Sequence, residues 1–161
     1  MKVLKMNLPT EFDLSDLSRI NIFRNLPHAD LRQSSELSNR KTFLSGKSLM
    51  TVNRTGEVVY FILSGAIKVH AEQEDGADVS ISILGPGKMI GEMSALDQTD
   101  RSTSVLTLEE TTPVRMDLDT FRHCLTAIPT LASDLACTLS ARLRSANERI
   151  QSLAAVEVEA R

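Results

Sequence analysis

The middle of the chain alternates apolar and polar residues with a period of two, the pattern of half-buried β-strands. Residues 67–70 and 79–83 alternate in this way, and the pair Asp75-Gly76 lies between them. An Asp-Gly pair between two alternating runs predicts a β-hairpin. Further short strands are expected at residues 58–63, 105–108 and 112–116. Short strands with turns every ~8–12 residues predict an antiparallel sandwich or barrel, not alternating β/α units.

The N-terminal segment, residues 1–45, has helical spacing instead of strand spacing. It predicts two short helices around a break at Pro27, the second of which starts at Asp30. Leu31 and Leu37 are expected to face inward from that second helix. These helices would lead directly into the sheet.

The segment after residue 117 returns to helical spacing. Asp119 is a candidate N-cap for a short helix. Pro129 ends that helix and opens the next one, because Pro is tolerated in a first turn, and no Pro or Gly follows it. The expected fold is therefore mainly β with flanking helices. Residues 1–128 would form the domain and residues 129–161 a long C-terminal helix.

Apolar residues on this last helix repeat with 4-3-4-3 spacing over about two heptads. They are Leu139, Leu143, Ala146, Ile150 and Leu153. One alternative packs this stripe on the domain's own sheet. The stripe is narrow and has charged flanks, however, so a partner helix explains it better. Two copies of one helix are the simplest such pair, which predicts a homodimer through the C-terminal helix.

Composition excludes several classes of protein. The 161 residues carry a net charge of −3, so the composition does not require the basic surface of a nucleic-acid binder. The two cysteines and three histidines match no metal-binding spacing, and no metal is expected. No apolar run approaches the ~20 residues of a membrane span, and no signal peptide is evident. We expect a cytoplasmic protein with reduced cysteines.

The loop at residues 87–105 carries the residues with chemical function. Residues 92–96 favour a helix but have room for one turn, and a helix start exposes N–H groups that attract anions. Glu92 and Arg101 lie nine residues apart, so the loop ends can bring them together. A guanidinium grips phosphate oxygens, whereas a carboxylate suits a sugar hydroxyl. Glu92 and Arg101 together therefore fit a ligand that carries a phosphate and a sugar hydroxyl. They also fit an ion pair that stabilises a surface loop.

Residues 91–105, which read GEMSALDQTDRSTSV, resemble the phosphate-binding cassette of cyclic nucleotide-binding domains. This family includes catabolite-activator-type (CRP/FNR) bacterial regulators, cyclic-nucleotide-dependent kinases and gated channels. Residues 59–65, the turn at 85–87 and the helix from Pro129 also resemble it, so the likeness extends over most of the chain. The resemblance implies an eight-stranded jelly-roll (double-stranded β-helix) barrel, a C-terminal dimerisation helix and a part in signal transduction and transcription regulation.

The resemblance also implies roles for particular residues. Glu92 would accept the ribose 2′-hydroxyl, and Arg101 would bind the equatorial oxygen of the cyclic phosphate. Backbone N–H groups near Ser94 and Ala95, with the Ser102 hydroxyl, would complete the phosphate cradle. The cassette residues that would contact ligand are Gly91, Glu92, Met93, Ser94, Ala95, Arg101, Ser102 and Thr103. Val69 and Ile81 are candidates to flank the base, with plain core packing as the alternative for both.

The base-reading position departs from the cAMP-responsive regulators. In those proteins the long helix places two adjacent hydroxyl residues against adenine, and the matching residues here are Ala146 and Asn147. Ala146 donates nothing, whereas Asn147 offers a donor and an acceptor to a base edge. Ser102 also suits a guanine in the syn orientation. The expected ligand is therefore cAMP, with cGMP second.

Regulators of this type continue into a helix-turn-helix, and this sequence ends about where that domain begins. We expect no DNA binding by this chain alone, whether it belongs to a transcription factor or is a stand-alone sensor. Two other functions remain open. An effector-independent scaffold for dimerisation is disfavoured by the intact Arg101. A phosphodiesterase or cupin-like metalloenzyme is disfavoured by the missing His/Glu cluster, so no enzymatic activity is expected.

Overall fold

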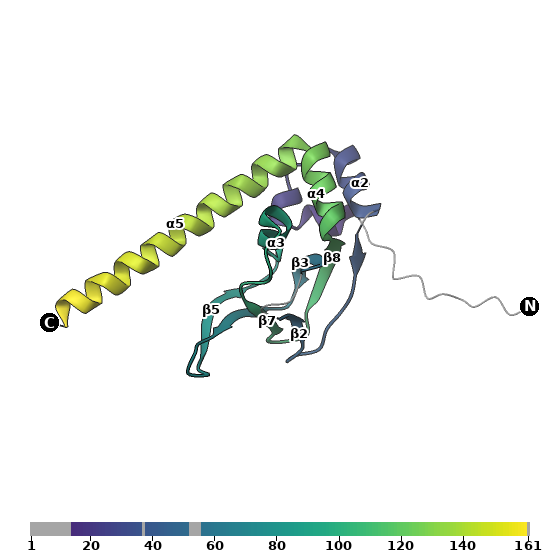
Figure 1. Cartoon of the computed structure of the whole chain (residues 1–161). Helices are drawn as coiled ribbons and strands as arrows, with labels where there is room; N and C mark the ends of the chain where they lie inside the picture. Colours follow the sequence, from purple (N-terminus) through teal and green to yellow (C-terminus); the bar gives the residue numbers. More distant parts are fainter. Residues whose placement is uncertain (1–13, 37, 52–55, 161) are drawn as a thin grey trace, which may run out of the picture.

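The structure is a computed structural model that describes residues 14–36, 38–51 and 56–160. Its strands form two four-stranded antiparallel sheets, one in the order β1-β8-β3-β6 and the other in the order β2-β7-β4-β5. Figure 1 shows the helices gathered at one end of these sheets. The strands are β1 Asn39–Arg40, β2 Ser48–Met50, β3 Val58–Ser64, β4 Ile67–Glu72, β5 Asp78–Leu84, β6 Met89–Ile90, β7 Ser104–Thr107 and β8 Thr112–Asp117.

The chain passes from one sheet to the other at every step except the β4–β5 hairpin. This order is that of a jelly roll, as predicted. The ladders between the described strands stay within each sheet, so they form a sandwich, and the expected closure into a barrel is not seen. The predicted hairpin is confirmed, with Gly76 at a φ of 81° in its turn.

Strand β3 is buried on both faces, which explains why its sequence is continuously apolar instead of alternating. One face packs against the helices, where the Phe61 ring lies 5.0 Å from Phe23 and 5.8 Å from Phe121, centroid to centroid. The other face, with Tyr60 and Ile62, packs against β2, β4 and β7 of the second sheet. The strand therefore belongs to both hydrophobic clusters of the molecule.

Helices flank the sheets on the N-terminal and C-terminal sides, as expected. They are α1 Leu14–Ser18, the 3₁₀ turn η1 Asn21–Phe23, α2 His28–Glu36, α3 Glu92–Asp97, α4 Leu118–Ala127 and α5 Pro129–Glu159. Pro129 lies in the first turn of α5, which confirms that it opens the last helix.

Two predicted helix starts are each wrong by two residues. Helix α2 begins at His28 instead of Asp30, because the Pro27 carbonyl already accepts the N–H groups of Asp30 and Leu31. Leu31 packs against the core as expected. Helix α4 begins at Leu118, with extended Asp117 at the N-cap instead of Asp119. Leu37 lies outside the described residues.

Helix α5 leaves the body of the molecule (Figure 1). Its first turns are held by buried Leu131 and Leu135, and Leu139 still packs against the core. From Leu143 onward every residue described is exposed. The apolar stripe of this helix therefore does not pack on the domain's own sheet from Leu143 onward, whereas Leu139 at its start does pack against the domain core.

No single helix in the described ranges has the length and apolar composition to cross a membrane. Helices α4 and α5 pass that test only when taken together, and they are bent by 111° at the break between them.

Candidate functional site

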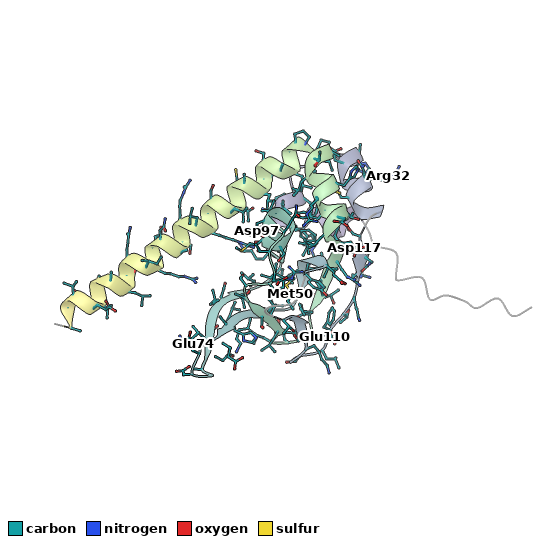
Figure 2. All side chains as sticks on the ribbon, in the orientation of Figure 1. Arg32, Met50, Glu74, Asp97, Glu110 and Asp117 are labelled. Carbon is teal, nitrogen blue, oxygen red and sulfur yellow. The ribbon has the colours of Figure 1, made fainter. Side chains whose placement is uncertain are left out.

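A cavity of about 750 Å³ lies between the sheets, helix α3 and one face of helix α5. This volume is within the range of small-molecule sites. Its wall comes from β4 and β5, from the cassette around α3, and from the middle of α5. Figure 2 shows Met50, one of the lining residues, in the interior of the molecule, whereas Glu74 at the hairpin tip lies well away from it.

Helix α3 starts at a glycine in a conformation that other residues avoid. Gly91 has a φ of 95°, and a Cβ there would lie 2.6 Å from Arg101 Nη1 and 2.9 Å from the Val58 carbonyl oxygen. Both the backbone angle and the space therefore require glycine. By helix geometry, the N–H groups of Glu92, Met93 and Ser94 have no acceptor within the helix. They form the N-terminal end of a helix of six residues, which is longer than the single turn that the sequence predicts.

Arg101 is a buried cation bound to main-chain oxygens. Its side chain is 7% exposed, Nη1 donates to the Gly91 carbonyl at 2.9 Å and Nη2 to the Val58 carbonyl at 2.5 Å. Burial lowers the pKa of Arg101, and nearby Tyr60 and Glu92 act in the opposite direction. A guanidinium stays protonated in proteins and has five N–H donors. Donors remain for a second acceptor on the cavity side.

Glu92 is also buried, at 1% exposure, and its partner is Arg142 of helix α5. Nη1 of Arg142 donates to Glu92 Oε1, and its Nη2 donates to the Met89 carbonyl at 2.6 Å. Glu92 Oε2 is buried without a hydrogen-bond partner among the described residues. The alternative of a surface Glu92–Arg101 ion pair is therefore wrong: both groups are buried, and the carboxylate pairs with a different arginine.

A family model for the cyclic nucleotide-binding domain matches residues 40–127, more than half of the chain. The chain belongs to the cyclic nucleotide-binding domain family. This match covers the sheets, the cassette and helix α4.

The relatives of this cyclic nucleotide-binding domain include CRP-like regulators. It is 28% identical over 145 residues to the CRP-like cAMP-activated global transcriptional regulator of Mycobacterium tuberculosis, which covers 90% of this chain and 65% of that protein. The catabolite activator protein of Thermus thermophilus has a similar structure, with a TM-score of 0.74 and 26% identity, over 83% of this chain and 63% of that one.

The same fold occurs in the regulatory subunit of a cAMP-independent protein kinase A from Trypanosoma brucei. That likeness has a TM-score of 0.71 and 21% identity, over 78% of this chain and 45% of that one. Because a fold does not determine a ligand, the ligand has to be argued from the site. This chain spans less than two thirds of the length of each of these three relatives.

Most residues predicted for the cyclic nucleotide site line one cavity. Val69 is nearly buried in its wall, and Ile81 is 43% exposed at its edge. The predicted residues that line it are Gly91, Glu92, Met93, Ser94, Arg101, Ser102, Thr103, Val69 and Ile81.

Two predicted residues are not brought to the cavity in this chain. The Ala95 side chain is buried in the core cluster and does not line the cavity. Asn147 is exposed and does not line the cavity, whereas its neighbour Ala146 does. The lining residues of α5 recur at spacings of three and four, which mark one helix face, and Asn147 lies about 200° around the helix from Ser145 and hence off that face. The expected base contact from Asn147 is therefore not made within one copy of the chain.

The polar residues that α5 does present were missed from the sequence. Arg142, Ser145 and Arg149 all line the cavity, as does Thr138. Arg149 Nη1 also donates to the Ile81 carbonyl at 2.9 Å. A local signal for the first existed, because Arg142 lies four residues before Ala146 and hence on the same helix face. The described residues contain no group of three or more His, Cys, Asp or Glu side chains placed to hold a metal ion.

Proposed function

We propose that this domain binds a cyclic purine nucleotide in the cavity, with cAMP as the first expected ligand and cGMP as the second. The observation that carries the proposal is Glu92, a buried carboxylate whose Oε2 has no partner in the described part of the chain. It lines the cavity together with the buried Arg101. A buried polar atom without a partner is costly unless something else binds it.

The two oxygens of Glu92 suggest a division of roles. Oε1 is held by Arg142, which neutralises the carboxylate and fixes its orientation. Oε2 is then free to accept a hydrogen bond from the ribose 2′-hydroxyl. A sugar hydroxyl supplies a donor without adding charge, which suits an acceptor that is already paired with a cation.

The phosphate would lie between Arg101 and the start of helix α3. Arg101 keeps its two carbonyl contacts and uses its remaining donors for an equatorial oxygen. The N–H groups at the helix start, with the hydroxyls of Ser102 and Thr103, supply neutral donors on the other side. The base would lie along Val69 and Ile81.

We further propose that the domain is the sensor module of a CRP/FNR-type regulator and forms a homodimer through α5. The two cysteines are free, which suits a reduced, cytoplasmic compartment. Helix α5 touches the ligand site through Arg142 and exposes an apolar stripe farther along. If the nucleotide binds more tightly when α5 is in one of two positions, binding would increase the population of that position. The change in α5 would then be passed to a partner helix.

Calorimetric titration with cAMP and cGMP tests the proposal. The wild-type protein should bind at least one of them, and Arg101→Gln should weaken binding by about 100-fold, since it removes charge-assisted bonds worth roughly 3 kcal/mol. Arg40→Gln is the control, because it breaks a half-buried ion pair with Asp16, and neither residue lines the cavity. No heat with either nucleotide into the high-micromolar range would reject the proposal and favour the effector-independent scaffold.

A further inference from the structure

Helix α4 holds helix α3 through Arg122. The Arg122 Nε donates to the Ala95 carbonyl at 2.6 Å, and Nη2 donates to the Ser94 carbonyl at 3.2 Å. Its Nη1 also binds Asp119 at 2.9 Å, but that carboxylate is 96% exposed. The two carbonyl contacts therefore carry most of the interaction, because exposed ion pairs contribute little.

Helix α3 needs such support because it has only six residues. Helices this short are not stable on their own. At its C-terminal end, Gln98 adopts a left-handed conformation and gives its N–H to the Ser94 carbonyl at 3.2 Å. The Arg122 guanidinium satisfies the next carbonyl, and its positive charge is favourable at the negative end of the helix.

The short length of α3 couples its two ends. Ser94 supplies one of the N–H groups that have no acceptor within the helix, and its carbonyl is bound by Arg122. At the other end, Arg101 holds the Gly91 carbonyl. The N–H groups proposed to bind the phosphate thus belong to a short helix that is hydrogen-bonded to Arg101 at one end and to Arg122 at the other.

We propose that Arg122 is a positioning residue for nucleotide binding: it acts on the phosphate through helix α3 without touching the ligand. This inference rests on the proposed function. Because α4 runs into α5 at Pro129, Arg122 also connects the anion-binding turn to the helix that carries Arg142. A preorganised turn loses less freedom when ligand binds, so its loosening lowers affinity.

Affinity and amide exchange together test this role. Arg122→Gln should weaken binding of cAMP and of cGMP by the same factor of roughly ten. The factor is the same because Arg122 supports the helix that faces the phosphate, which both nucleotides share. Arg122→Lys, which keeps the charge but lacks the planar fork, should recover part of the affinity. Asp119→Asn should bind nearly as wild type. Arg40→Gln is the matched control, since Arg40 and Arg122 are 31% and 34% exposed in their ion pairs.

Hydrogen exchange without nucleotide tests whether Arg122 stabilises α3 independently of ligand binding. Arg122→Gln should speed amide exchange at residues 95–98, whereas Arg40→Gln should not. If Arg122→Gln exchanges faster at these residues but binds both nucleotides with wild-type affinity, the positioning role is overturned. If the wild type binds neither nucleotide, the proposed function and this role both fall, and exchange still reports whether α3 is braced. If Arg122→Gln does not fold, Arg122→Lys decides: wild-type affinity in that variant overturns the role.

Discussion

Arg101 is a buried cation whose immediate hydrogen-bond acceptors are carbonyl groups, and glycines make the room for it. A Cβ on Gly56 would lie 2.5 Å from the Arg101 Cζ, and a Cβ on Gly91 would lie 2.6 Å from its Nη1. The sequence pointed to Gly91 and Arg101 together, since both lie in the cassette. Gly56 had no local signal, because its importance depends on where a distant side chain packs.

Gly91→Ala should destabilise the domain by roughly 2 to 3 kcal/mol, from backbone strain and steric conflict together. Gly76→Ala is the matched control, because Gly76 has a φ of 81° but open space around it. It should cost only the strain of a left-handed alanine, about 1 kcal/mol. Urea unfolding measures both. Equal losses in the two variants would mean that the contacts around Gly91 carry no cost.

The Glu92–Arg142 pair is expected to be strongly coupled, because the carboxylate is 2% exposed in that pair. Arg142→Met should cost about 3 kcal/mol, since it leaves Glu92 buried without its cation. Glu92→Gln should cost less in the Arg142→Met background than in wild type. A double-mutant cycle from urea unfolding gives the coupling energy. Additive losses would show that the two residues do not stabilise each other.

At the scale of elements, periodicity predicted the strands and helices well where local pattern decides them. The β4–β5 hairpin and the start of α5 at Pro129 follow from turn chemistry and proline geometry. Burial was less predictable. Strand β5 alternates like a half-buried strand, yet Val79, Ile81 and Ile83 are all at least 39% exposed. This strand lies at the edge of its sheet, and Ile81 lines the cavity instead of packing in the core.

The exposed stripe of α5 predicts a concentration-dependent dimer. Leu143, Ile150 and Leu153 are each more than 60% exposed. Replacing Leu143 and Ile150 with Gln should weaken dimerisation by at least 1,000-fold, because each buried side chain contributes about 2 kcal/mol and the pair occurs twice. Sedimentation equilibrium measures this. Arg144→Gln with Glu148→Gln, on the other side of the helix, is the control. A wild-type protein that stays monomeric at high concentration contradicts the prediction.

At the scale of the whole molecule, the site is made from segments that lie far apart in the sequence. Arg142 and Glu92 are separated by 50 positions, and Arg101 and Val58 by 43. After the bend of 111° between α4 and α5, the middle of α5 borders the cavity together with the cassette. A ligand in this cavity would contact the second sheet, α3 and α5 at once.

Nucleotide binding should therefore stabilise the whole domain against unfolding. It should also slow amide exchange in the three segments that line the cavity. At a ligand concentration of 100 times Kd, linkage predicts a gain of about 2.7 kcal/mol in unfolding free energy. Amide exchange should slow in residues 91–103, in the β4–β5 hairpin and in residues 138–149. Protection confined to the cassette would contradict the arrangement of the cavity. Removal of the nucleotide by dialysis should restore the original exchange rates.

The sequence by itself determined the alternating strands, the hairpin, the glycine-led turn of the cassette and the long last helix, because each depends on backbone preference and periodicity within a few residues. It also marked Glu92 and Arg101 as the candidate ligand-binding groups. Only the tertiary structure decided that Glu92 pairs with Arg142, that Arg101 binds carbonyls, and that Asn147 points away from the cavity. Those outcomes depend on how α5 is rotated and placed against the sheets, and packing between distant segments sets that placement.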